Sequence, residues 1–101
     1  MSNDRSREMA AAWRDLVSAV DEILWETWDP LGVNASERAY DEYSSYAGNL
    51  ARQAIKGSIE RVHEDLRAIR IGSMGLREND KADHDVAIRL VKLAEDIMPR
   101  P

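Results

Sequence analysis

The 101-residue chain contains no cysteine. It can therefore form no disulfide, no thiolate zinc site and no cysteine nucleophile, a composition that suits the reducing cytoplasm. No run approaches the roughly 18 apolar residues of a membrane span, and residues 1–14 are polar where a signal peptide has an apolar core. We therefore expect a cytoplasmic protein that does not enter the membrane.

Signatures of chemistry are equally scarce. Gly72 and Gly75 lack the lysine that a phosphate-binding loop requires, and neither histidine lies near a recognisable nucleophile motif. Glu60 and His63 have the Glu-x-x-His spacing of carboxylate-bridged di-iron bundles, but such a site needs a second copy of the motif and two further glutamates. The residues before His84 do not supply that copy. We therefore predict no catalytic residue, no metal and no cofactor.

Strand signals are absent, because no segment sustains an alternation of apolar and polar residues and no hairpin dipeptide joins β-branched runs. Apolar residues instead recur every three or four positions, as on one face of an amphipathic helix. This spacing predicts helices over about residues 5–27, 37–56 and 80–98, with a further helix that follows Gly57 and Ser58. We therefore predict a single all-α domain over the whole chain, a compact four-helix bundle that is mainly antiparallel with short connections.

The connection between the first two helices, at residues 28–34, has the most specific sequence of the chain. Pro30 ends the first helix because proline disfavours helical geometry in the residue before it, and Gly32 permits a positive φ angle. The Asp29 carboxylate is placed to accept backbone N–H bonds from the turn that follows. Ser36 is the expected N-cap of the second helix. These features describe either a rigid turn packed on the bundle or a rigid surface for a partner.

The formal net charge of −5 is unevenly distributed. Residues 15–47 carry eight acidic side chains against one arginine, a charge of −7, whereas residues 48–77 carry six basic side chains against three acidic ones, a charge of +3. The acidic segment disfavours nucleic acid, because phosphate contacts depend on clustered lysine and arginine. Either the two segments pair with each other, within the fold or across a dimer, or the acidic segment binds a basic partner protein.

The acidic segment also holds five of the six aromatic residues. Tyr40, Tyr43 and Tyr46 are three positions apart, and since a helix turns by about 100° per residue they cannot all lie at the centre of one narrow face. We expect Tyr43 in the core and at least one of the others partly exposed. Asp41 and Glu42 lie between them, so this segment combines aromatic contact area with carboxylates, as a docking surface does. Half-buried core tyrosines would explain the same pattern.

Three short motifs follow one another along the chain: Trp28-Asp29-Pro30-Leu31-Gly32-Val33, Asp41-Glu42-Tyr43-Ser44-Ser45-Tyr46 and Met74-Gly75-Leu76. Together they resemble a group of small bacterial proteins of unknown function whose pattern reads roughly W-D-P-I-G-V, D-E-Y-D-x-Y and M-G-L. The similarity covers about residues 20–95, with Leu31 where isoleucine is frequent and Ser44 in place of an acid. The resemblance implies a small helical bacterial domain and assigns no catalytic residue. In physical character alone, the chain is also similar to immunity proteins that neutralise colicin nucleases.

We therefore predict that the protein is not an enzyme but a protein-binding domain, most concretely an immunity-type inhibitor or adaptor that docks a basic partner such as a toxin. The predicted contact residues are acidic or aromatic and flank the first connection: Glu22, Glu26, Trp28, Asp29, Tyr40, Asp41, Glu42 and Tyr46. One alternative is a structural or regulatory homo-oligomer, in which the same aromatics pack against a second copy. Another is a small metal-binding protein or enzyme that uses Glu60, His63 and His84.

Overall fold

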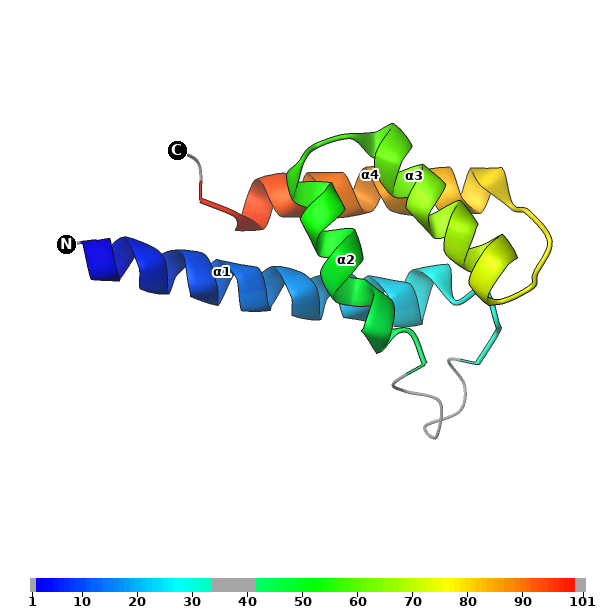
Figure 1. The fold of residues 1–101 in the computed structure, drawn as a ribbon, viewed down its shortest axis with the longest axis horizontal. Helices are drawn as coiled ribbons and strands as arrows, with labels where there is room; N and C mark the ends of the chain where they lie inside the picture. The colour runs from blue at the N-terminus through cyan, green and yellow to red at the C-terminus, as the bar shows by residue number, and fades with distance from the viewer. Residues whose placement is uncertain (1, 34–41, 100–101) are drawn as a thin grey trace.

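The computed structural model describes residues 2–33 and 42–99, which form helices joined by turns and loops (Figure 1). The elements in chain order are α1 (Ser2–Ile23) with the π-helical turn η1 (Leu24–Trp28), α2 (Ser44–Ile55), α3 (Ile59–Ala68) with the π-helical turn η3 (Ile69–Ser73), and α4 (Asp80–Ile97). No strand occurs in this part of the chain, and the predicted all-α class is confirmed. Of its helices, none combines the length and the apolar character needed to cross a bilayer.

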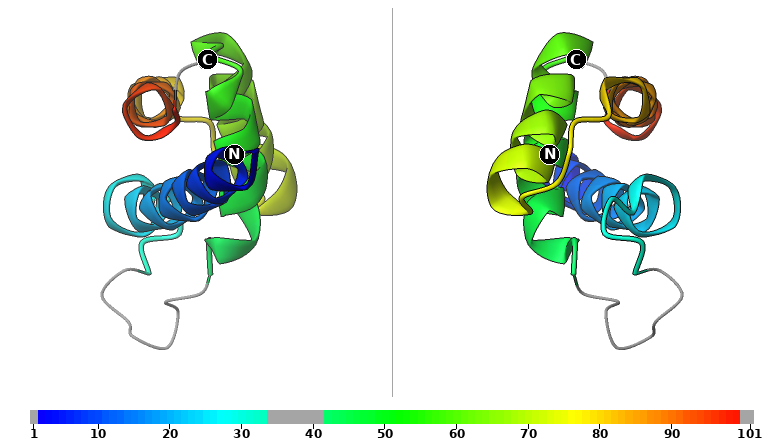
Figure 2. Two further views of the ribbon diagram at one scale, coloured as in Figure 1. Left: turned by 90° about the vertical axis from the view of Figure 1, so that its left-hand side faces the viewer. Right: turned by 90° about the vertical axis from the view of Figure 1, so that its right-hand side faces the viewer.

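The bundle combines an antiparallel pair with two crossing helices. α1 and α4 run side by side in opposite directions, so the start of α1 and the end of α4 lie at the same end of the molecule (Figure 1). Figure 2 views these two helices nearly along their axes, whereas α2 is seen from the side. α2 contacts both α1 and α4, and α3 packs mainly against α4. The predicted four-helix bundle is therefore confirmed, with α2 crossing the antiparallel pair.

Each helix contributes its apolar face to one core. Every helix supplies at least one completely buried leucine, the set being Leu16, Leu24, Leu50, Leu66 and Leu90. On α2, Ala47, Ala51 and Ala54 are also buried, and their small side chains let this helix lie close to α1 and α4. Complete burial of one leucine contributes roughly 1.5–3 kcal/mol, so this shared core is the main source of stability.

The predicted boundaries hold for three of the four helices. The helix expected over residues 5–27 is α1 together with η1, and the helix expected over residues 80–98 is α4. The third helix begins after Ser58, whose hydroxyl accepts the Arg61 backbone N–H at 3.2 Å as an N-cap does. Periodicity located these helices because each one buries a continuous apolar face.

The prediction that residues 42 and 43 belong to the second helix is wrong. The prediction placed the start of this helix at residue 37, which lies outside the described residues together with the expected cap Ser36. The two residues before Ser44 form a turn, and α2 begins only at Ser44. The Tyr43 hydroxyl donates to the Asp29 carboxylate, so the turn before α2 contacts the end of the first helix.

Candidate functional site

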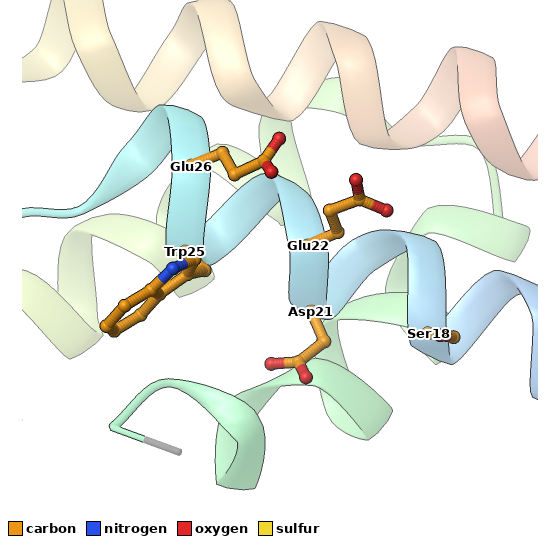
Figure 3. Close-up of a pocket in the computed structure, with 5 residues that line it drawn as sticks. All are labelled: Ser18, Asp21, Glu22, Trp25 and Glu26. Atoms are coloured by element: carbon orange, nitrogen blue, oxygen red, sulfur yellow. The ribbon is translucent and has the colours of Figure 1, made fainter. Parts of the chain in front are cut away.

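Two adjoining hollows follow one face of α1 and η1. The first has a volume of about 170 Å³ and is lined by Ser18, Asp21, Glu22, Trp25 and Glu26 (Figure 3). The second, of about 330 Å³, lies between α1 and the start of α2 and is lined by Trp13, Arg14, Val17, Ser18, Asp21, Ser44 and Ala47. Ser18 and Asp21 line both hollows, so the two adjoin, and we call them together the α1 groove.

Three carboxylates lie at one end of the α1 groove. Asp21 points toward α2 and accepts the Ser44 hydroxyl at 3.0 Å, which ties α1 to the start of α2 (Figure 3). Glu22 and Glu26 point away from α2 and are exposed. Neither glutamate takes part in an ion pair with another residue of the described ranges. Arg14 is also exposed and lies at the opposite end of the groove.

Apolar surface accompanies these charges. Trp13, Val17 and Trp25 are half-buried, and each exposes part of its side chain along the groove. The Arg52 guanidinium on α2 lies 5.9 Å from the centre of the Trp13 ring, within the range of a cation–π interaction. The Trp25 ring packs against the Tyr43 ring at a centroid distance of 6.2 Å. These contacts with Arg52 and Tyr43 therefore fix the positions of the two tryptophans that line the groove.

The ion pairs of the described residues do not join the acidic segment to the basic segment. The pairs are Arg61–Asp65, Arg67–Glu78, Arg67–Asp80, Arg70–Asp83, Lys81–Asp85 and, when the histidine is protonated, His63–Asp80. All of them lie within residues 61–85. Among the described residues, Asp15, Asp21, Glu22 and Glu26 therefore form no ion pair with the basic segment.

The predicted contact residues differ in their exposure in the structure. Glu22, Glu26 and Glu42 are exposed, and Tyr46 is half-buried against the core. The predictions for Tyr40 and Asp41 lie outside the described residues. The remaining two, Trp28 and Asp29, form hydrogen bonds inside the fold. Trp28 is only 5% exposed, so little of its side chain is available to a partner.

A buried cluster that the sequence analysis did not identify consists of Trp28, Arg70 and Asp83, and we call it the Asp83 cluster. Asp83 is completely buried and accepts bonds from Arg70 Nη2 at 2.7 Å, Arg70 Nε at 3.0 Å and Trp28 Nε1 at 2.8 Å. Arg70 is 6% exposed, and its guanidinium lies 5.8 Å from the centre of the Trp28 ring. A buried charge needs such partners, because its transfer from water is costly. The cluster joins η1, η3 and α4.

The connection after η1 is held by a second set of hydrogen bonds. Asp29 adopts a left-handed conformation with a φ angle of 30°, and its backbone N–H donates to the Leu24 carbonyl at 2.9 Å. Its carboxylate accepts the Val33 N–H at 2.9 Å and the Tyr43 hydroxyl at 2.6 Å. The Tyr43 oxygen in turn accepts the Leu31 N–H at 3.1 Å. The predicted bond from a following backbone N–H to the Asp29 carboxylate and the predicted burial of Tyr43 are both confirmed.

These contacts predict an alkaline loss of stability. Burial, followed by the hydrogen bond to Asp29, raises the pKa of Tyr43. A tyrosine with a raised pKa stabilises the fold fully below the pKa of about 10 in the unfolded chain, and this contribution declines as the pH rises above that value. In urea unfolding at pH 8, we expect Tyr43→Phe to reduce the free energy of unfolding by about 1–3 kcal/mol, because the Leu31 N–H loses its acceptor.

Above pH 10, the difference between wild type and Tyr43→Phe should shrink by up to about 1.4 kcal/mol per pH unit. Tyr46→Phe is the matched control, since the Tyr46 hydroxyl makes no hydrogen bond within the described residues. A Tyr43→Phe difference that stays constant from pH 8 to 11 would contradict the assignment.

The histidines do not complete a metal site within the described ranges. The rings of His63 and His84 pack edge to face at a centroid distance of 5.6 Å, between α3 and α4. His63 Nε2 lies 3.5 Å from an Asp80 carboxylate oxygen, which Arg67 also contacts at 3.3 Å. No group of three or more histidine, aspartate or glutamate side chains among the described residues has the geometry to hold a metal ion.

Comparison of the chain with protein-family models, with curated protein sequences and with solved structures produced no match. The resemblance to small helical bacterial proteins therefore stays a prediction that rests on the three sequence motifs. The function has to be inferred from the chemistry of this chain's own surface.

Proposed function

We propose that this protein is a non-catalytic binding domain that docks a basic partner protein through the α1 groove. An immunity-type inhibitor or adaptor of a small bacterial family, acting on a basic toxin in the cytoplasm, is the most concrete form of the proposal. The observation that carries it is the position of Asp21, Glu22 and Glu26 beside half-buried tryptophans, with neither glutamate in an ion pair within the described part of the chain. Acids steer the encounter with a basic surface, and aromatics supply contact area.

The position of these acids supports a role outside the fold. They lie near the C-terminal end of the helix formed by α1 and η1, where the helix dipole disfavours negative charge. Neither element has a basic residue in its last turn. Glu22 and Glu26 are also one turn apart, and like charges at that spacing are destabilising by roughly 0.2–0.5 kcal/mol. The arrangement costs stability locally, and a basic partner would relieve that cost.

We expect replacement of both glutamates, Glu22→Gln with Glu26→Gln, to weaken capture of the native partner from source-cell extract at least about tenfold. The reason is that two charge contacts are lost, and about 1.4 kcal/mol corresponds to a factor of ten. The free energy of unfolding should change by less than about 0.5 kcal/mol, as for surface substitutions. The two measurements are affinity capture at increasing salt and urea denaturation.

The matched control replaces two exposed glutamates elsewhere, Glu64→Gln with Glu95→Gln, which changes the net charge by the same amount. This control should capture the partner as wild type does. We call Glu22→Gln with Glu26→Gln the groove variant. If the groove variant and the control captured the partner equally well, the proposed surface would be refuted. A large loss of stability in the groove variant would instead assign these acids a structural role.

A further inference from the structure

We infer that the partner presents an amphipathic α-helix to the α1 groove, with two Lys or Arg residues one turn apart beside a bulky apolar side chain. This inference rests on the proposed function and specifies the partner's binding element. Three observations support it. They are the shape of the groove, the fact that the backbone groups of its walls bond mainly within their own helices, and the order of the charges along it.

The shape of the groove matches a short helix. Its α1 and η1 lining residues recur every three or four positions between Trp13 and Glu26. At 1.5 Å per residue, this stretch is about 20 Å long, the length of roughly four helical turns. Helices pack by placing side chains of one into the grooves of another. The hollow of about 330 Å³ beside Val17 and Ala47 offers space for such a side chain.

The backbone along the groove excludes recognition by strand addition. The groove is formed by side chains of α1, η1 and α2, whose backbone N–H and C=O groups bond mainly within their own helices. No sheet edge is present in the described residues to pair with an extended peptide. The walls of the groove therefore offer no row of backbone partners, and an α-helix needs none because it bonds its own backbone groups.

Charge along the groove specifies the sequence of that helix. Glu22 and Glu26 are one turn apart, so they match two cations spaced three or four residues apart on the partner. The apolar side chain lies over Val17, and the far end meets Arg14, where a further cation would be repelled. The partner helix is therefore basic toward one end only. A second copy of this chain fits less well, because it brings one groove arginine, Arg14, against three carboxylates.

The test is selection of a phage-displayed library of random 20-residue peptides on the full chain. We expect enrichment of peptides with two Lys or Arg residues at a spacing of three or four and a bulky apolar residue on the same helical face. Synthetic versions of these peptides should gain helical circular dichroism on binding. Their affinity should fall at least tenfold for Glu22→Gln with Glu26→Gln and stay unchanged for Glu64→Gln with Glu95→Gln.

Three outcomes would overturn the inference. The enriched peptides could lack helical spacing or contain internal proline, or they could bind the groove variant as tightly as wild type. Light scattering could also show a dimer that the groove variant dissociates, in which case a second copy occupies the groove. The proposed function is tested separately by capture of the native partner. If that capture depends on Glu22 and Glu26 while the selected peptides show no helical pattern, the helix inference alone fails.

Discussion

Replacement of Asp83 by alanine is expected to destabilise the fold by about 3–5 kcal/mol, because removal of one partner leaves the other charge of a buried pair uncompensated. Arg70 is 6% exposed and would lose the carboxylate that accepts its Nε and Nη2 bonds. The Trp28 indole N–H would lose its acceptor as well. Since small domains have total stabilities of about 5–15 kcal/mol, urea denaturation and the thermal midpoint should both show a large loss.

Two further variants test the reason for that loss. The double change Arg70→Met with Asp83→Leu removes both charges, so we expect it to be more stable than Asp83→Ala by at least about 1 kcal/mol. Asp85→Ala breaks an exposed pair with Lys81 and should cost less than about 1 kcal/mol. If Asp83→Ala were no more destabilising than Asp85→Ala, the buried pair would be contradicted.

Replacement of Asp29 by alanine is expected to cost about 3 kcal/mol. From described residues, the carboxylate accepts the Val33 N–H and the Tyr43 hydroxyl, and hydrogen bonds to a charged group are worth about 1.5–3 kcal/mol. Alanine also disfavours the left-handed conformation that residue 29 adopts, whereas aspartate and asparagine tolerate it. Urea denaturation at pH 7 measures the change.

The informative control at this position is Asp29→Asn. Asparagine keeps an oxygen acceptor and accepts the positive φ angle, so we expect a loss of only about 1 kcal/mol. Glycine removes the side chain but adopts the positive φ angle without strain. The stability of Asp29→Gly should therefore lie between the stabilities of the alanine and asparagine variants. Equal stabilities of the alanine and asparagine variants would show that the carboxylate oxygens do not hold the connection.

The helices could be predicted from the sequence because their stability comes from buried faces that repeat every three or four residues. Leu16, Leu50, Leu66 and Leu90 all lie within the predicted helices and are completely buried. The hydrogen bond from the Tyr43 side chain to Asp29 across the connection could not be predicted. Propensity and spacing carry no information about such a contact.

The Asp83 cluster could have been predicted in part from the sequence, because its two charged residues lie on otherwise apolar helix faces. Asp83 precedes Ala87 and Leu90 by four and seven positions, so it belongs to the apolar stripe of α4. Arg70 follows Leu66 by four positions and likewise belongs to the buried seam of α3 and η3. Two opposite charges on two apolar faces predict a buried pair. Their third partner, Trp28, depends on the tertiary arrangement and could not be inferred.

The candidate site was predicted only in part. Glu22 and Glu26 were identified from charge, and they lie in the α1 groove. Trp13 and Val17 follow the apolar spacing of the first helix, but they are only half-buried and line the groove where α2 crosses α1. The position of that crossing is a property of the whole fold, so no local pattern reveals that these side chains border a depression.

The two π-helical turns affect how the fold tolerates a change in the length of the chain. Each accommodates one more residue per turn than an α-helix, as expected if an inserted residue had been absorbed there. Loss of one residue within Leu24–Trp28 would therefore return this turn to α-helical geometry and leave the residues beyond it on nearly the same face of the helix. Loss of one residue within the regular part of α1 would instead turn every later residue by about 100° around the helix axis and move Trp28 away from Asp83. The chain is thus more tolerant of a one-residue deletion at η1 or η3, each only five residues long, than within α1.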